Sequence, residues 1–142
     1  MFCDLDHFKA VNDTHGHLVG DTVLTAVADC LRTELRDQDG IGRFGGEEFV
    51  VYLALSPTQA ERVAARLRAA VAGLRPAPGV HITVSIGLAH HHTPGGSGIS
   101  APRDTGAGTT AALTALVDRA DTAMMAAKAA KAAGRDRICT AA

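Results

Sequence analysis

The chain lacks tryptophan, and aromatic residues make up only 4% of its 142 residues. Its core must therefore come from Ala, Val, Leu and Ile, and a hydrophobic content of 46% is enough for one domain. No apolar run reaches the length of about 18 residues that marks a membrane-spanning helix, and no signal peptide is visible. We therefore expect a single cytoplasmic domain with no membrane segment in this chain.

An excess of charge is also missing, since the formal net charge is -1. Proteins that bind nucleic acid polymers usually present a basic face, so we expect no such partner. Cysteine is scarce: Cys3, Cys30 and Cys139 are odd in number and share no metal-ligand spacing. Reduced thiols in a cytosolic protein are the simplest interpretation.

Hydrophobic periodicity predicts an alternation of strands and helices. Apolar runs over residues 1–6 and 80–88 are typical of strands, whereas residues 21–36 repeat apolar positions at helical spacing. The segment Arg43–Tyr52 is typical of a hairpin. Its Gly45-Gly46 pair is expected to supply the positive φ angles of a two-residue turn.

The rest of the chain extends this pattern. Residues 56–59, Ser-Pro-Thr-Gln, predict a capping box at the start of a helix that Gly73 ends. Residues 90–110 are rich in Gly, Pro and Ser and predict a loop, which an Ala-rich helix over 111–133 and an edge strand over 137–139 follow. The order β-α-β-β-α-β-α-β indicates the α+β class, with a mainly antiparallel central sheet and packed helices.

Three acids are candidates for chemistry. Asp4 and Asp6 end the first predicted strand, and Glu47 follows the Gly-Gly turn. If that strand pairs with the hairpin, Asp4 and Glu47 meet at one end of the sheet. Two carboxylates and a backbone carbonyl make the hard oxygen site that Mg²⁺ prefers. Acids near a turn are more often simply solvated, so spacing alone leaves both interpretations open.

Two further segments are candidates for binding phosphate. A tight turn within Asp6–Asp13 would direct backbone N–H groups at an anion, although an ordinary connection into a helix explains the segment equally well. Lys128, Lys131 and Arg135 lie near the end of the last predicted helix, where a solvated basic face that favours the helix dipole is the simpler alternative. If they converge on the acids, Arg135 can bind phosphate in a bidentate way.

Short motifs follow one another in a fixed order along the chain. They are Asp4-Leu5-Asp6-His7-Phe8-Lys9, Asn12-Asp13, Gly16-His17, Gly20-Asp21, the segment Arg43–Phe49, the segment Thr83–Gly87, Ala120-Asp121 and Gly134-Arg135. Together they resemble the diguanylate cyclase (GGDEF) family from Asp4 to about Ile138. The resemblance implies a nucleotidyl-cyclase-like (ferredoxin-like) architecture and an enzyme that condenses two GTP into cyclic di-GMP and two pyrophosphates.

The resemblance also implies a role for each matching residue. A metal ion, Mg²⁺ or Mn²⁺, would be bound by the side chains of Asp4 and Glu47 and by the carbonyl of Leu5. Glu47 and Glu48 would be the catalytic acids, with Glu48 positioning or activating the attacking 3′-hydroxyl. The substrate GTP would contact the phosphate-binding turn His7, Phe8 and Lys9, the guanine ligands Asn12 and Asp21, and the phosphate-neutralising side chains Lys131 and Arg135.

Regulation and assembly follow from the same resemblance. Arg36 and Asp39 form an R-x-x-D sequence ahead of the glycine turn, at the spacing of the family's inhibitory site for the product cyclic di-GMP. The simpler alternative for such a common pattern is a surface salt bridge. One domain would hold one GTP, so catalysis implies a symmetric homodimer.

The sequence also departs from the family pattern. The domain, residues 1–142, begins at the first strand and lacks the usual preceding helix and D-x-L-T segment. Three extra residues before Gly134 leave open whether Lys128 or Lys131 takes the family's lysine position. Residues 90–92, three histidines in the predicted loop, could bind metal, although a solvated loop is simpler.

Two alternative functions therefore remain. One is a catalytically silent domain that binds GTP or cyclic di-GMP as a signalling module. The other is a nucleotidyltransferase acting on a different nucleotide, which the guanine ligands Asn12 and Asp21 disfavour.

Overall fold

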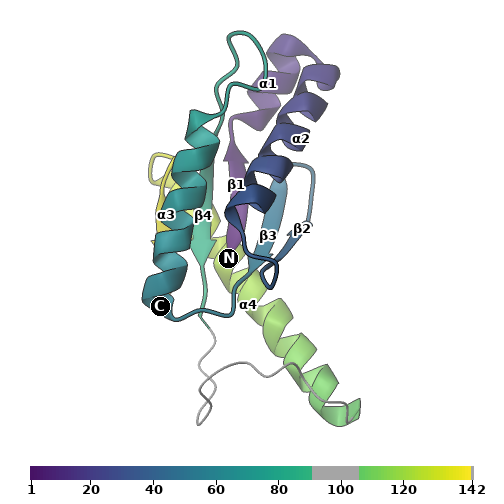
Figure 1. Cartoon of the computed structure of the whole chain (residues 1–142), viewed down its shortest axis with the longest axis vertical. Helices are drawn as coiled ribbons and strands as arrows, with labels where there is room; N and C mark the ends of the chain where they lie inside the picture. Colours follow the sequence, from purple (N-terminus) through teal and green to yellow (C-terminus); the bar gives the residue numbers. More distant parts are fainter. Residues whose placement is uncertain (91–105, 142) are drawn as a thin grey trace.

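The structure is a computed structural model, and it describes residues 1–90 and 106–141. Strands and helices alternate along most of the chain (Figure 1). They are β1 (Phe2–Asp6), α1 (Phe8–His15), α2 (His17–Glu34), β2 (Gly40–Arg43), β3 (Glu48–Tyr52), α3 (Pro57–Gly73), β4 (Thr83–Leu88), α4 (Gly106–Ala132) and β5 (Ile138–Thr140).

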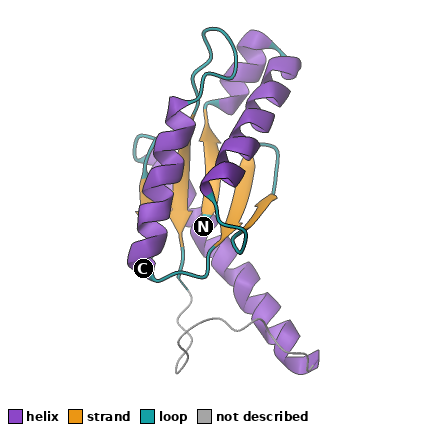
Figure 2. Ribbon diagram, viewed as in Figure 1, coloured by secondary structure: helices purple, strands orange, loops and turns teal. Residues whose placement is uncertain are grey.

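The strands form one sheet in the order β2-β3-β1-β4-β5. β1 pairs antiparallel with both β3 and β4, and β2 pairs antiparallel with β3, whereas the edge strand β5 runs parallel to β4. Helices α2 and α3 cover one face of the sheet, and α4 crosses the other (Figure 2). The predicted α+β class and mainly antiparallel sheet are confirmed.

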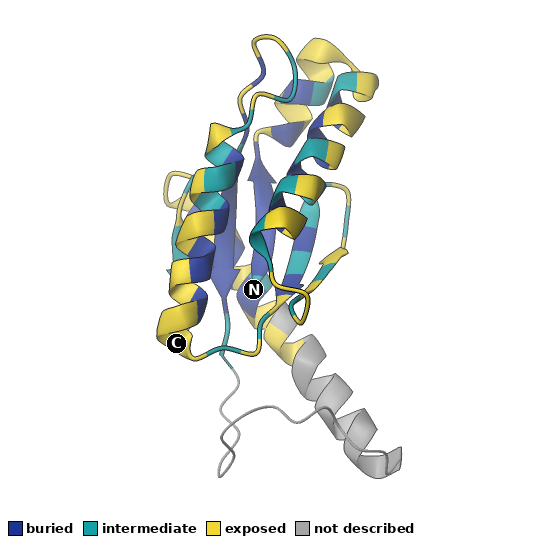
Figure 3. Cartoon of the chain, viewed as in Figure 1, coloured by how far each residue is buried: buried dark blue, intermediate teal, exposed yellow. Residues whose placement is uncertain are grey.

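The central strand, β1, is buried along its whole length. Every residue of β1 is buried, because helices cover both faces of the strand (Figure 3). Cys3 and Leu5 pack into the cluster beneath α2 and α3, and Phe2 packs with Ala123 and Ala127 of α4. β1 therefore carries its two acids, at its carboxyl end, into a rigid frame.

Helix α4 lies unusually close to the sheet at Gly87 of β4. A Cβ placed on Gly87 would overlap the carbonyl oxygen of Ala123 and the backbone nitrogen of Ala127. The absence of a side chain at this one position therefore allows helix backbone to pack directly against strand backbone. The contact fixes the path of α4 toward its carboxyl end, where Lys131 lies.

Several sequence-based expectations hold locally. The capping box of Ser56 and Gln59 is present, and α3 ends at Gly73. Gly134, with φ of 125°, follows the end of α4 as expected. None of the described helices combines the length and hydropathy that a bilayer crossing demands.

Other expectations are wrong. Gly45 and Gly46 do not adopt positive φ; pairing stops at Arg43 and Phe49, and a wider turn forms in which the N–H groups of Phe44 and Gly45 both donate to the carbonyl of Glu48. The periodic pattern alone could not separate this wider turn from a two-residue one.

One helix was not predicted, and several element boundaries also differ from the prediction. Helix α1 was not expected as a separate element, and α2 begins at His17 rather than at 21. β4 begins at Thr83 rather than 80, although Val80 and Ile82 are buried. The loop predicted over 90–110 includes residues 106–110, which are helical; residues 91–105, with two of the three histidines, lie outside the described residues.

Candidate active site

The ammonium group of Lys131 lies at the carboxyl end of β1, between the acids that the sequence singles out. Its Nζ donates to Asp4 Oδ1 at 2.5 Å, to the Leu5 carbonyl at 2.9 Å and to Glu47 Oε1 at 3.3 Å. These three oxygens belong to the residues expected to bind a metal ion. The structure therefore brings Asp4, Leu5 and Glu47 around one cation.

Strand register explains how these residues meet. Asp4 is opposite Glu48 in the β1–β3 ladder, and the N–H of Leu5 donates to the carbonyl of Glu47 at 3.1 Å. The tip of the β2–β3 hairpin is thereby held beside the end of β1. Lys131 reaches these oxygens from α4, which lies on the sheet face opposite α2 and α3.

The surroundings of Lys131 shift the pKa of its ammonium group. Burial by itself lowers the pKa of Lys131, but hydrogen bonds and charge attraction from Asp4 and Glu47 raise it, so the pKa lies above its ordinary value. The ammonium form is therefore the one present at neutral pH. Lys128, one turn earlier on α4, is exposed, so Lys131 is the one of the two lysines that contacts Asp4 and Glu47.

Asp6, the third acid, does not face Lys131. Its carboxylate accepts hydrogen bonds from Thr83 Oγ1 at 2.7 Å, Ser85 Oγ at 2.8 Å and the backbone N–H of Asp136 at 2.9 Å. The residue is 1% exposed, so these bonds replace the water that a buried carboxylate would otherwise need. Asp6 therefore ties β1 to β4 and to the turn that follows α4.

A hollow of about 340 Å³ opens beside Lys131. It is lined by residues from the start of α1, the hairpin tip and the end of α4: His7, Phe8, Lys9, Ala10, Asp13, Glu47, Lys131 and Arg135. His7 has a left-handed backbone, with φ of 58°, which turns the chain sharply out of β1 into α1. The expected phosphate turn and the two expected phosphate side chains therefore share one hollow, which we call the phosphate pocket after that expectation.

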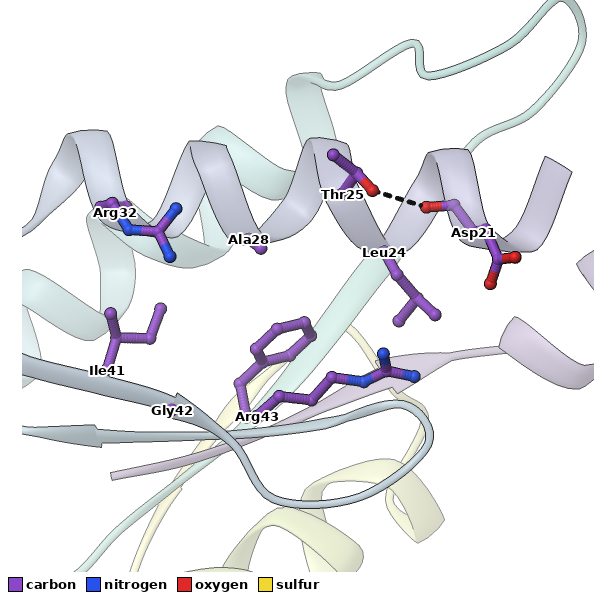
Figure 4. Close-up of a pocket in the computed structure, with 9 residues that line it drawn as sticks. Asp21, Leu24, Thr25, Ala28, Arg32, Ile41, Gly42 and Arg43 are labelled. Carbon is purple, nitrogen blue, oxygen red and sulfur yellow. Dashed lines mark hydrogen bonds between the residues drawn. The ribbon is translucent and has the colours of Figure 1, made fainter. Parts of the chain in front are cut away.

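Asn12 and Asp21 come from the two helices that follow β1. A Cβ on Gly20 would overlap Asn12 Oδ1, so the Asn12 amide lies directly against α2 at that glycine. Asp21, the next residue, is exposed and lines a second hollow of about 370 Å³ between α2 and the hairpin (Figure 4). The Asn12 side chain therefore lies against α2 one residue before Asp21.

Arg43 is a site residue that the sequence reasoning did not single out. Its guanidinium donates to the carbonyls of Gly45 at 3.0 Å and Gly46 at 2.8 Å, and so braces the glycine turn. Figure 4 shows Arg43 at the same end of the second hollow as Asp21. Its position just before the turn was the available signal.

Glu48 begins β3 and is half-buried. A Cβ on Gly45 would overlap Glu48 Oε2, so the Glu48 carboxylate folds over the glycine turn. Gly45 therefore leaves room for the end of the Glu48 side chain, and it does so without a positive φ.

Arg36 and Asp39 lie at the other end of β2 from the hairpin tip. The N–H of Arg36 donates to Asp39 Oδ2 at 3.0 Å, and the N–H of Asp39 donates to the carbonyl of Arg36 at 2.9 Å. The R-x-x-D sequence thus forms a closed turn with an exposed Arg36 side chain. This turn is separate from the phosphate pocket.

The oxygen atoms around Lys131 determine which ions the site can hold. Within the described residues, no three His, Cys, Asp or Glu side chains cluster to hold a metal by themselves. The Asp4, Leu5 and Glu47 oxygens form an incomplete oxygen shell, of the kind that Mg²⁺ completes with phosphate and water. The same three oxygens already hold the ammonium group of Lys131, so they are arranged to accept positive charge.

Comparison with known proteins agrees with this geometry. The family model described as diguanylate cyclase, GGDEF domain, matches residues 1–135. The diguanylate cyclase DgcP of Pseudomonas aeruginosa is 43% identical over 140 residues, which cover 95% of this chain and 18% of DgcP. The chain thus spans less than a fifth of that relative's length.

Solved structures show the same fold. The active GGEEF domain of a diguanylate cyclase from Vibrio cholerae superimposes with a TM-score of 0.77 at 28% identity, covering 99% of this chain and 80% of that one. The GGDEF domain of DgcB from Caulobacter crescentus, in complex with c-di-GMP, gives 0.73 at 28% identity, covering 99% and 75%. This chain therefore belongs to the diguanylate cyclase, GGDEF domain, family.

Proposed function

We propose that this chain condenses two GTP molecules into cyclic di-GMP and two pyrophosphates, with Mg²⁺ or Mn²⁺ as cofactor. One observation carries the proposal: Lys131 Nζ is held by Asp4, the Leu5 carbonyl and Glu47, the three oxygen donors expected for the metal. These oxygens hold the Lys131 ammonium group at the end of β1, next to a hollow whose lining includes Lys9 and Arg135.

The same oxygens suit a hard divalent ion. When bound, the metal would offset the charge that grows on the phosphates during transfer. Lys131 would then have to leave Asp4 and Glu47, and the phosphate pocket that it lines offers the new partner for its ammonium group. Lys131 would thus neutralise phosphate in the loaded site.

The remaining residues of the pocket would orient the triphosphate. The N–H groups at the start of α1, after the left-handed His7, would contact phosphate oxygens, and Lys9 and Arg135 would add positive charge. Asn12 and Asp21 would bind the guanine edge, since a carboxylate accepts from guanine N1–H and N2–H groups that adenine does not present.

Glu48 would position the attacking 3′-hydroxyl and accept its proton. The 3′-oxygen of one GTP forms a bond to the α-phosphorus of the other, the α–β bridging bond breaks, and pyrophosphate leaves. A second such step closes the ring. Since one domain would hold one GTP, two copies facing each other across a twofold axis would be required.

The turn at Arg36 and Asp39 would bind the product. The exposed Arg36 guanidinium can stack on guanine and pair with phosphate, while Asp39 accepts from the guanine edge. The DgcB structure with c-di-GMP supports product binding by a domain of this fold. We expect Arg36→Ala to relieve product inhibition without changing the affinity for GTP.

Incubation of the purified chain with GTP and Mg²⁺ or Mn²⁺, followed by chromatography, tests the proposal. We expect cyclic di-GMP and pyrophosphate, a specific activity that rises with protein concentration as dimers form, and no product from Glu48→Gln. Lys128→Met, on the exposed side of α4, is the matched control and should keep its activity. GTP binding without any product at all concentrations would instead favour the silent signalling module.

A further inference from the structure

The turn after α4 has an unusual backbone. Gly134, Arg135 and Asp136 all have positive φ angles, of 125°, 61° and 42°. Glycine tolerates this region, but a Cβ makes it unfavourable, so Arg135 and Asp136 are strained. Such strain persists only where the surroundings hold it. Whatever holds this turn therefore determines how Arg135 is presented to the phosphate pocket.

Two residues distant in the sequence hold the turn. The N–H of Asp136 donates to Asp6 Oδ2 at 2.9 Å. The Arg68 guanidinium donates to the Asp136 carbonyl at 3.2 Å and pairs with the Asp136 carboxylate at 2.9 Å. Asp6 is buried, so its charge-assisted bond forms away from competing water. The turn is thus clamped from β1 and from α3 at once.

The clamp also reaches the last turn of α4. The N–H of Arg135 donates to the carbonyl of Ala130 at 3.2 Å, one residue before Lys131. Arg68 itself lies on α3, the helix that covers the sheet face opposite α4 (Figure 2). It does not line the phosphate pocket. Its hydrogen bond and ion pair both go to Asp136, which is the residue through which Arg68 would act on bound nucleotide.

We propose that Asp6 and Arg68 are positioning residues for triphosphate binding: they lock the left-handed turn that presents Arg135, and the end of α4 with Lys131, to the phosphates. The inference rests on the proposed nucleotide function. Releasing the clamp lets the strained turn relax, so the two basic side chains lose their fixed positions. Contacts with the guanine at Asn12 and Asp21 do not depend on this turn.

Calorimetric titrations with two ligands test the inference. The ligands are GMP and α,β-methylene GTP, a triphosphate that cannot react, both with Mg²⁺. Arg68→Gln should weaken the triphosphate about five- to tenfold, roughly the net worth of one hydrogen bond, and leave GMP within about twofold. Asp6→Asn should show the same selectivity if it folds.

Two controls separate positioning from general destabilisation. Ser85→Ala removes a hydrogen bond to the same Asp6 carboxylate without touching the turn, and Arg66→Gln removes a different α3 arginine, which pairs with Glu34 at 2.8 Å. Both should leave the ratio of the two affinities unchanged. Equal weakening of both ligands by Arg68→Gln, or no weakening, would overturn the inference. Failure of the unmodified chain to bind the triphosphate would instead remove the proposed function itself.

Discussion

The two ends of the proposed nucleotide site, called here the phosphate end and the guanine end, are built in different ways. At the phosphate end, Lys131 is joined to Asp4, Leu5 and Glu47, which lie 84 to 127 residues away in the sequence. At the guanine end, Asn12 and Asp21 come from consecutive helices, and Asp21 is exposed. The first end depends on the whole fold, whereas the second depends on one local helix contact. Disturbing the fold should therefore harm phosphate binding first.

The largest effect is expected where α4 meets the sheet. Gly87→Ala would force a Cβ into the backbone of Ala123 and Ala127, and neither backbone can move without undocking α4. We expect the free energy of unfolding to fall by about 3 kcal/mol or more, measured by urea denaturation. Gly42→Ala is the matched control, because a Cβ there meets nothing within 4 Å; an equal loss in both variants would contradict the close packing.

The next largest effect on stability is expected from removing the ammonium group of Lys131. Lys131→Met leaves Asp4, whose side chain is 8% exposed, facing Glu47 without a counterion. We expect a loss of about 2 kcal/mol, below the range for a fully buried pair because Lys131 keeps some contact with water.

Added Mn²⁺ should then stabilise Lys131→Met more than the unmodified chain, since no ammonium competes for the oxygens. The measurement is the thermal midpoint with and without Mn²⁺, with Lys128→Met as control. An equal shift in all three proteins would contradict the exchange of lysine for metal.

A smaller and more selective effect is expected at the guanine end. Gly20→Ala would push the Asn12 amide away from α2, because a Cβ there overlaps Asn12 Oδ1. We expect GMP affinity to fall about tenfold, through the loss of one well-placed hydrogen bond, with little change in stability. In an Asn12→Ala background the same substitution should cost almost nothing. Additive losses in the double variant would show that Gly20 acts by another route.

The smallest effect concerns Cys3 in the core of β1. Burial raises the pKa of its thiol to about 12, whereas the ordinary value is 9.0. Because the folded pKa is the higher one, the stability linked to this proton is fully present below pH 9 and is lost as pH rises toward 12. Iodoacetamide at pH 8 should therefore label Cys3 only after urea is added, as mass spectrometry can show; labelling of the folded chain would contradict its burial.

The sequence predicts the local features of the molecule well. The capping box at Ser56, the strand that carries Asp4 and the hairpin that carries Glu47 all follow from short patterns that the structure contains. The turn at Gly45 does not follow, because spacing alone could not show that this glycine makes room for Glu48 rather than adopting a positive φ.

Long-range contacts account for the rest. The choice of Lys131 over Lys128 depends on where α4 crosses the sheet, which Gly87 determines from a distant strand. Arg68 carries no local signal at all, since its partner Asp136 lies 68 residues away. Residues of this kind become visible only once the chain is folded.

The most direct test of the metal site is a crystal structure with Mn²⁺ and α,β-methylene GTP, collected to reveal anomalous scattering from manganese. We expect a manganese peak bound by Asp4, Glu47 and the Leu5 carbonyl, with Lys131 moved onto the phosphates. A manganese peak elsewhere, with Lys131 still bonded to Asp4, would contradict the account.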